Sequence, residues 1–248
     1  MNYFQAIFLG VLQGLTEFLP ISSSGHLVIA QYFFPGFNQT GILFDVVLHL
    51  GTLIAIVFFF RKKILTLNTN YLRLLIIGTI PAVFVGYFFQ SIVEEVFNSL
   101  FVVGIALLVT GMLNKRTNKL VAKSNKITDA KAFVIGIFQS IALIPGISRS
   151  GSTIFAGAKQ DIKKAKAAEF SFILSVPAVL GANVLQFAKH KTQIVENTSI
   201  YLVGLIFAFI SGLLAINLVF RFLKLKKFNV FAYYCFILGA IILINELV

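Results

Sequence analysis

Two short polar stretches carry most of the residues of this chain that could do chemistry. The first, residues 17–26, reads EFLPISSSGH, and the second, residues 145–153, reads PGISRSGST. Arginine can hold phosphate oxygens through two parallel hydrogen bonds, and a helix N-terminus offers free N–H groups to an anion. Serine is a favoured residue at such helix starts. Together the two stretches predict a binding site for a phosphate or a diphosphate.

Four residues of these stretches are predicted to take part in catalysis. Near a phosphate, Glu17 either supports a divalent cation or moves a proton. Ser23 is the candidate nucleophile, and Glu17 or His26 would take its proton. In the alternative, an activated water attacks and Ser23 only donates a hydrogen bond. Arg149 is assigned to the phosphate oxygens. The purely structural alternatives are a Glu17–Arg149 ion pair and a hydrogen bond from His26 to its loop.

Six small residues at the expected helix starts are predicted to bind phosphate oxygens. At such positions the N–H groups have no partner within the helix, and the positive end of the helix dipole faces the loop. For any single serine the alternative is that it only caps its helix. The six residues are Ser22, Ser24, Gly25, Ser148, Ser150 and Gly151.

The composition of the chain indicates a membrane protein. Of its 248 residues, 58% are hydrophobic and 12% are charged, and the mean hydropathy is +0.92. Soluble domains are about 25% charged. We therefore attribute the net charge of +12 to cytoplasmic loops and expect no nucleic-acid partner. Cys235 is the only cysteine, which excludes an internal disulfide, and its apolar neighbours indicate a packing role.

The elements that must position the polar stretches are helices that cross or enter the membrane. A full crossing needs about 20 mostly apolar residues. The segments that qualify are residues 41–60, 71–90, 97–114, 168–188, 199–220 and 229–247. Shorter apolar pieces form two pairs broken by the polar stretches, at residues 3–18 with 23–34 and 131–144 with 152–158. The sequence thus predicts an all-α integral membrane protein with six transmembrane helices and two re-entrant helix pairs.

A constant offset relates the two halves of the chain. It pairs Gly10 with Gly136, Gln13 with Gln139, Ile21 with Ile147, Ser22 with Ser148, Ser24 with Ser150, Gly25 with Gly151, Phe44 with Phe170, Gly78 with Gly204 and Gly86 with Gly212. With one re-entrant pair and three crossings per half, the second half is inverted relative to the first. We expect one membrane domain, residues 1–248, made of two inverted repeats at about residues 1–125 and 126–248.

The basic residues agree with this topology. Of the 21 Lys and Arg residues, 18 fall on one predicted side, Lys189 and Lys191 fall on the other, and Arg149 lies in the second break. Lysine and arginine mark cytoplasmic loops. Both chain ends and Glu94–Glu95 are therefore predicted to face outward. The basic loops lie near residues 61–73, 115–131, 159–166 and 221–227.

One further acid and histidine lie in the first expected span. Asp45 and His49 are four residues apart, so they share one helix face. We expect Asp45 near the outer end and interpret the two residues as a local pair or as support behind the site.

At these residues the sequence resembles a known family. QGLTEFLPISSSGHL, residues 13–27, and PGISRSGST closely resemble the two signature motifs of the bacterial undecaprenyl-diphosphate phosphatases of the bacitracin-resistance type. FDVVLHLGT, residues 44–52, and EFSFILSVPAVLGA, residues 169–182, also look like this family. The resemblance covers essentially the whole chain.

The resemblance implies a hydrolase of the bacterial plasma membrane that opens to the outer face. It would remove one phosphate from the C55 isoprenoid diphosphate left after cell-wall polymer export, so that the monophosphate carrier is recycled. Divalent cations, Mg²⁺ or Ca²⁺, would support the activity. Carried over by motif, the functional residues fall on Glu17, Ser23, His26, Ser148, Arg149 and Thr153, and Thr153 thereby joins the predicted phosphate-binding residues.

One position departs from the family pattern. Many members have Glu where this chain has Gln13, so that ExxxE becomes QxxxE. Gln13 and Glu17 still share a helix face, and both carboxylate and amide oxygens bind hard cations. Glu17 and Gln13 are therefore the predicted metal ligands, with one negative charge fewer than in the paired version.

A transporter or flippase of an anionic lipid is the alternative function, because inverted repeats and broken helices are also a transporter plan. Glu17 and His26 beside the phosphate site favour hydrolysis, since an anion carrier needs no base. The sequence leaves the chain-length preference and the oligomeric state open, and a homodimer is compatible with it.

Overall fold

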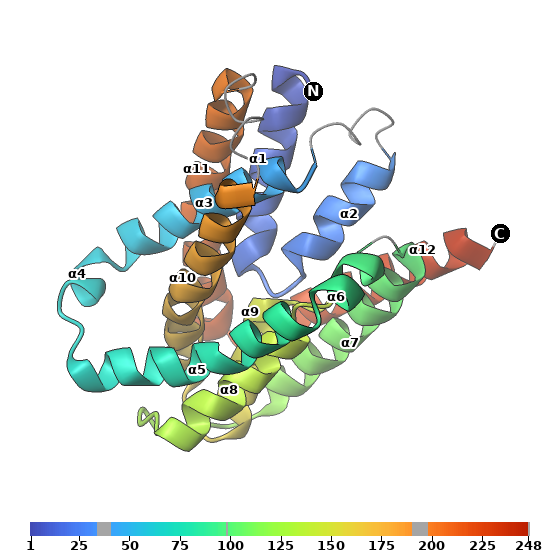
Figure 1. Ribbon diagram of the computed structural model, residues 1–248. Helices are drawn as coiled ribbons and strands as arrows, with labels where there is room; N and C mark the ends of the chain where they lie inside the picture. Colours follow the sequence, from blue (N-terminus) through green and yellow to red (C-terminus); the bar gives the residue numbers. More distant parts are fainter. Residues whose placement is uncertain (34–40, 98, 190–197, 248) are drawn as a thin grey trace.

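The computed structural model describes residues 1–33, 41–97, 99–189 and 198–247, and this part of the chain is built from helices (Figure 1). Apart from one isolated bridge between Ser124 and Ile162, the described residues form no β-structure. The helices are α1 (Tyr3–Phe18), α2 (Ser23–Phe33), α3 (Gly41–Phe59), α4 (Arg61–Ile64), α5 (Thr69–Phe88), α6 (Gln90–Val96), α7 (Leu100–Lys119), α8 (Asp129–Ile141), α9 (Arg149–Lys159), α10 (Lys164–Lys189), α11 (Thr198–Lys224) and α12 (Asn229–Leu247).

Both predicted breaks are present, and each joins two short helices. The first helix, α1, ends just before Pro20, because the residue preceding a proline is disfavoured in helical geometry. The bounds of α1 and α2 agree with the predicted pieces to within one residue, and α8 begins two residues and ends three residues earlier than predicted. The second break differs, because α9 begins at Arg149 rather than at residue 152. The prediction that Arg149 lies in the loop was therefore wrong, and its side chain starts from the first turn of a helix.

The long helices fit a multi-pass membrane protein. Four of them, α5, α7, α11 and α12, are long and apolar enough to cross a membrane. The described part of α3, Leu43–Phe59, is apolar but shorter. The helix α10 is 26 residues long and is not among these four. The count of six crossings therefore stays a prediction.

Helices from the two halves pack against each other in matching pairs. The helix α1 lies along α11, and its counterpart α8 lies along α5. These contacts are close, because a Cβ added at Gly10 would lie 2.5 Å from the Gly204 carbonyl oxygen. One added at Gly136 would lie 2.4 Å from the Gly78 carbonyl oxygen. The same glycine contact therefore occurs twice. In one case the α1 glycine of the first half meets α11 of the second, and in the other the α8 glycine of the second half meets α5 of the first.

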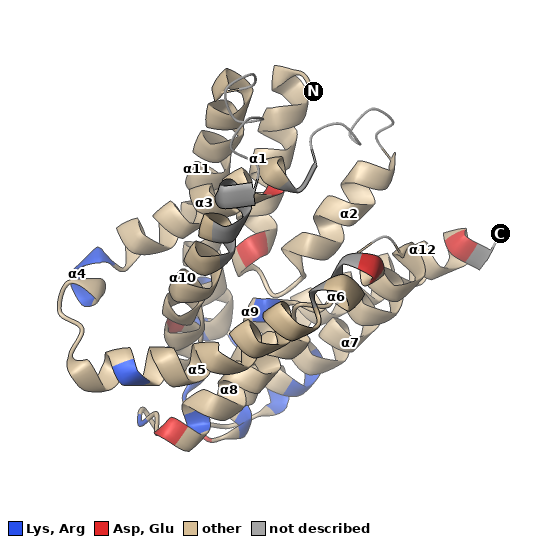
Figure 2. Cartoon of the chain, viewed as in Figure 1, with Lys and Arg blue, Asp and Glu red and all other residues tan. Residues whose placement is uncertain are grey.

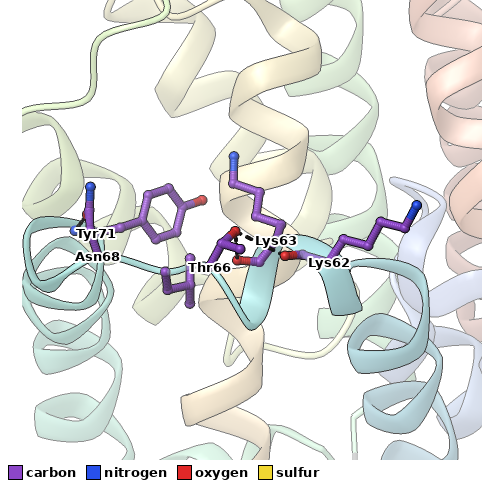
Figure 3. A pocket seen from close by; sticks show the side chains of 6 residues that line it. Lys62, Lys63, Thr66, Asn68 and Tyr71 are labelled. Atoms are coloured by element: carbon purple, nitrogen blue, oxygen red, sulfur yellow. Dashed lines mark hydrogen bonds between the residues drawn. The ribbon is translucent and has the colours of Figure 1, made fainter.

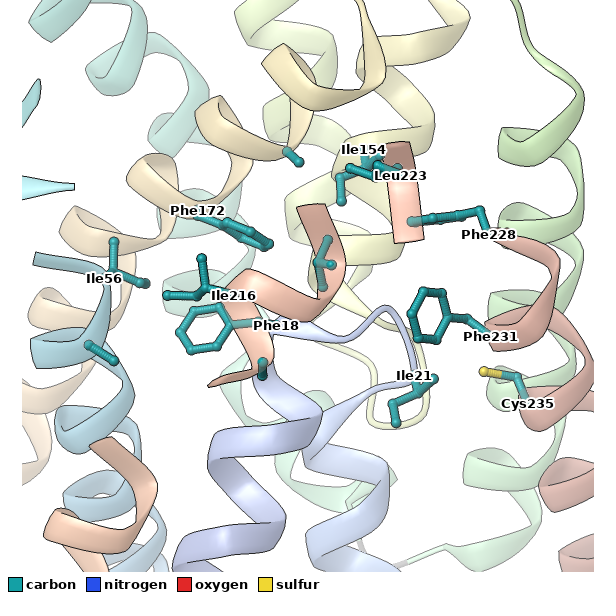
Figure 4. Close-up of a cluster of buried hydrophobic side chains, with 14 residues drawn as sticks. Phe18, Ile21, Ile56, Ile154, Phe172, Ile216, Leu223, Phe228, Phe231 and Cys235 are labelled. Atoms are coloured by element: carbon teal, nitrogen blue, oxygen red, sulfur yellow. The ribbon is translucent and has the colours of Figure 1, made fainter. Parts of the chain in front are cut away.

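An apolar cluster holds the end of α1 in place beneath the first break (Figure 4). Phe18 meets Phe172 of α10 edge to face, with the ring centroids 5.4 Å apart. Ile216 of α11, beside Phe18, and Cys235 of α12 also belong to the cluster (Figure 4). Cys235 is free and buried, which confirms its predicted packing role.

Most of the basic residues lie at one end of the bundle, where Asp129 and Glu169 pair with some of them (Figure 2). Basic residues gather around α4, the start of α5 and the adjoining ends of α7 and α8. Acidic residues mark α6 and the end of α12, which carry Glu95 and Glu246. Lys191, assigned to the second side in the sequence, lies outside the described residues.

Candidate active site

The two breaks lie against each other and are held by α7. Ser22 accepts a hydrogen bond from the backbone N–H of Gly146 at 3.1 Å. Asn114 of α7 donates to the carbonyl oxygen of Pro20 at 2.6 Å, and Thr110 donates to that of Gly146 at 2.8 Å. Irregular backbone inside a membrane needs such partners, because lipid offers none. The breaks therefore form one polar junction.

A serine starts the second helix at each break. Ser22 accepts a hydrogen bond from the N–H of Gly25 at 3.3 Å, and Ser148 accepts one from Gly151 at 3.1 Å. Ser22 adopts a φ of +71°, a left-handed geometry that costs energy for a residue with a side chain. These two serines thus make the capping contacts that were the alternative to phosphate binding. The N–H groups of Gly25 and Gly151, which were predicted to bind phosphate, donate to the serines instead.

The remaining predicted phosphate ligands also contact the junction. Ser24 lies 3.3 Å from the Ser22 hydroxyl, and Ser150 lies 3.2 Å from the Ser148 hydroxyl. Thr153 lies one turn after Arg149 and its hydroxyl is 2.6 Å from that of Ser171 on α10. Phosphate binding by these residues stays a prediction.

Glu17 is the centre of the site. Its Oε1 accepts a hydrogen bond from the Arg149 guanidinium, which joins the two repeats. Its Oε2 accepts hydrogen bonds from the Ser23 hydroxyl at 2.6 Å and from Nε2 of Gln13 at 3.1 Å. Nε2 of His49 lies 3.7 Å from the same oxygen. The structure thus brings the predicted acid, serine, arginine and glutamine together.

The Glu17–Arg149 pair is largely shielded from solvent. The exposed fractions of the two side chains are 7% and 16%. Burying two charges costs free energy that their attraction repays only with good geometry and further hydrogen bonds. Ser23, Gln13 and the backbone oxygen of Ser171, which faces Nη1 of Arg149 at 3.4 Å, supply further contacts. The pair matches the structural alternative for Glu17, and the same carboxylate also contacts the Ser23 hydroxyl.

His26 points away from this centre. Its Nδ1 lies 2.6 Å from the carbonyl oxygen of Ser22, and its Nε2 lies 2.6 Å from the hydroxyl of Tyr234 on α12. A carbonyl only accepts, so Nδ1 carries the proton and Nε2 accepts from Tyr234. The ring makes the predicted structural hydrogen bond to the loop. In this arrangement Glu17, not His26, is the base in contact with Ser23.

Sequence reasoning did not single out Ser171 and Tyr234, which contact Arg149 and His26. His49 and Asp45 were interpreted as a local pair or as support behind the site. The Asp45 carboxylate accepts two hydrogen bonds from Gln31, each of 3.0 Å. Nδ1 of His49 instead lies 2.7 Å from the Asp45 backbone oxygen, which leaves Nε2 facing Glu17. A histidine in an apolar span was the available signal for this role.

The residues around Glu17 offer oxygen ligands to a cation. The described residues include no group of three or more His, Cys, Asp or Glu side chains that could hold a metal. Oε1 of Gln13, however, is buried without a hydrogen-bond partner beside the Glu17 carboxylate. Mg²⁺ is often held by one or two protein oxygens, with water and phosphate oxygens filling the other positions. The pair Glu17 and Gln13 fits that kind of site.

These features define a class, an all-helical membrane protein with a buried acid, serine and arginine where two broken helix pairs meet. Residues 6–241 match the family model described as bacitracin resistance protein BacA. The chain therefore belongs to the BacA family.

Curated relatives resemble the chain over nearly its whole length. "Undecaprenyl-diphosphatase 4" of Bacillus thuringiensis is 41% identical, covering 98% of this chain and 97% of its own. "Undecaprenyl-diphosphatase" of Syntrophotalea carbinolica is 39% identical, covering 96% and 97%. "Undecaprenyl-diphosphatase" of Methanococcus vannielii is 40% identical, covering 93% and 95%.

Proposed function

We propose that this protein hydrolyses undecaprenyl diphosphate to undecaprenyl phosphate and inorganic phosphate in the membrane. The reaction recycles the lipid carrier of cell-wall synthesis, and it accounts for the bacitracin-resistance description of the family. The observation that carries the proposal is the contact of Ser23, Glu17 and Arg149 in a chain about 40% identical to undecaprenyl-diphosphatases. The same relatives leave the transporter alternative without support.

In the proposed reaction Ser23 attacks the terminal phosphorus. The hydroxyl proton passes to Oε2 of Glu17, the Oγ–P bond forms, and the bond from phosphorus to the bridging oxygen breaks. Undecaprenyl phosphate leaves with that oxygen. Water then cleaves the phosphoserine and releases inorganic phosphate. In the alternative, water attacks directly and Glu17 takes its proton, while Ser23 only donates a hydrogen bond.

Arg149 is proposed to bind the phosphate oxygens and to stabilise the charge that develops on them. Positioning and charge neutralisation dominate phosphoryl transfer. In the substrate-free protein Glu17 accepts a hydrogen bond from the same guanidinium, so a bound diphosphate would compete for it. The proposed phosphate ligands Ser24 and Ser150 contact the capping serines Ser22 and Ser148, and Thr153 donates to the backbone oxygen of Arg149.

A divalent cation is proposed to assist at Glu17 and Gln13. The unpaired Oε1 of Gln13 supports this assignment. When bound, the cation would supply positive charge to the phosphate oxygens, as metal ions do in other phosphoryl-transfer sites. Its identity, Mg²⁺ or Ca²⁺, follows from the family resemblance alone.

The proposed architecture is a single domain of two inverted repeats, with six crossings and two re-entrant pairs. The duplicated contacts of Gly10 with Gly204 and of Gly136 with Gly78 support it. The gathering of basic residues at one end supports a cytoplasmic assignment for that end. The site would then open to the outer face. A homodimer stays a prediction that sedimentation in detergent would test.

The experiment that tests the function is phosphate release from undecaprenyl diphosphate by the purified protein in detergent, with and without Mg²⁺. The proposal expects release by the intact chain and its loss in Glu17→Gln. Lys163→Gln is the matched control, because Lys163 lies in a basic loop outside the site. No release by well-folded protein with either cation present would overturn the proposal.

A further inference from the structure

A second polar site lies at the basic end of the protein, apart from the residues around Glu17. A pocket of about 480 Å³ opens between α4 and the start of α5 (Figure 3). Its polar lining residues are Lys62, Lys63, Thr66, Asn68 and Tyr71. Figure 3 shows the two lysines extending from α4 and Tyr71 facing Lys63 across the pocket.

The pocket carries excess positive charge. Lys63 and Lys166 both contact Glu169, and Lys166 does so at 2.9 Å. One carboxylate is therefore shared by two ammonium groups. Among the described residues the ammonium of Lys62 has no acidic partner. The Tyr71 hydroxyl is also buried without a hydrogen-bond partner, which leaves a donor unused at the pocket wall.

An apolar groove of about 860 Å³ continues from this pocket. Leu67 lines both, so the polar and apolar regions adjoin. The groove follows α5 from Leu72 to Phe88 and is closed on its other side by Ile173, Pro177 and neighbouring residues of α10. A basic pocket at the head of a long apolar groove matches a ligand with an anionic head and a hydrocarbon chain.

We propose that the pocket and the groove together bind one anionic glycerophospholipid. Its phosphate would lie at Lys62 and Lys63, with Tyr71 as a further donor, and an acyl chain would lie along α5. Basic pockets at the cytoplasmic side of membrane helices bind anionic head groups. This proposal does not depend on the diphosphatase activity, because it uses none of the residues of the active site.

Tryptophan fluorescence provides the test, since the natural chain contains no tryptophan. Ile76→Trp introduces one in the groove, and Met112→Trp introduces one on α7 as the control. Both positions are exposed and lie about two helical turns from the basic ends of their helices. Each protein is placed in vesicles of ordinary phosphatidylcholine to which one brominated lipid is added. The brominated lipid is either phosphatidylglycerol or phosphatidylcholine, and its brominated acyl chains quench tryptophan on contact.

The proposal expects brominated phosphatidylglycerol to bind next to Ile76→Trp with about a fivefold preference over brominated phosphatidylcholine. Lys62→Gln should remove the preference, Lys62→Arg should retain it, and Lys119→Gln should leave it unchanged. Met112→Trp should be quenched equally by both lipids. Ile80→Trp, in the same groove, serves if Ile76→Trp does not fold.

Results of two kinds would overturn the proposal. One is equal quenching of Ile76→Trp by both lipids, or a preference that survives Lys62→Gln. The other is displacement of phosphatidylglycerol by an equimolar amount of undecaprenyl phosphate, which would assign the groove to an isoprenoid chain. Phosphate-release activity is measured separately on the same variants and should be unchanged in Lys62→Gln.

Discussion

The Ser23 hydroxyl donates a hydrogen bond to Oε2 of Glu17 over 2.6 Å, from the first turn of α2 back to the last turn of α1. The break at Pro20 allows this contact, because in a continuous helix residues six positions apart do not face each other. The acid and the hydroxyl therefore meet because the helix is interrupted, and the interruption itself survives because α7 satisfies its backbone.

Ser23→Ala tests whether this hydroxyl is the nucleophile. If it is, phosphate release should fall by at least about 10³-fold, since losing a true nucleophile removes the covalent route. Stopped assays on purified protein, with Lys163→Gln as the control, measure the effect. Retention of more than about a tenth of the activity would make a serine nucleophile untenable and leave direct attack by water as the mechanism.

Arg149→Lys tests the phosphate assignment. An ammonium cannot reproduce the planar fork of the guanidinium, so turnover should fall by roughly 10²–10³-fold, the scale for losing one transition-state donor. The charge opposite Glu17 is kept in this variant, so the fold should survive, which circular dichroism checks. Turnover at the level of the natural chain would remove Arg149 from the phosphate site.

Gln13→Glu tests the metal site. The substitution adds a carboxylate one turn before Glu17, where the unpaired Oε1 of Gln13 now lies. The protein should remain active and need less metal for half activity, because a second negative charge strengthens cation binding. Metal titrations of phosphate release measure this. Full activity of the natural chain in excess chelator would exclude a metal role, and an unchanged titration would exclude position 13.

Much of the framework could be predicted from the sequence because local signals set it. Proline, serine and glycine mark both breaks, and the apolar lengths separate short helices from long ones. The short helices α4 and α6 were not predicted, since stretches of 4 and 7 residues carry too little periodicity. Arg149 was assigned to the break because Ser148, Ser150 and Gly151 were all candidate helix starts, and in the structure Ser148 caps a helix that begins at the next residue.

The orientation of side chains within the site was less predictable. His26 was expected beside Ser23, but Tyr234, more than 200 positions away in the sequence, holds its Nε2 elsewhere. His49 likewise reaches Glu17 only because α3 lies against α1. Both contacts depend on how distant helices pack, and no spacing within one motif encodes that.

The paired glycine contacts lead to a prediction about stability. Gly10→Ala and Gly136→Ala should each destabilise the protein by about 1–3 kcal/mol, because the added methyl meets a backbone carbonyl that cannot rotate away. Gly181→Ala is the control, since its added methyl meets nothing within 4 Å and alanine favours a helix. Thermal unfolding in detergent should show a lower midpoint temperature for the first two variants. The midpoint of Gly181→Ala should not be lowered. Midpoints unaffected at Gly10 and Gly136 would contradict the close helix contact.

The inverted arrangement leads to a prediction about topology. Glu95 on α6 and Val121 after α7 are both exposed, and the distribution of basic residues puts Val121 on the cytoplasmic side and Glu95 outside. Glu95→Cys and Val121→Cys are made in a Cys235→Ala background, so that each protein has one thiol. In intact cells an impermeant thiol reagent should label Glu95→Cys, and Val121→Cys should react only after the membrane is opened. Because α7 is the only long helix among the described residues between the two positions, labelling of both from outside would exclude α7 as a crossing. The second repeat could then not be inverted relative to the first, and the proposed opening of the site to the outer face would lose its basis.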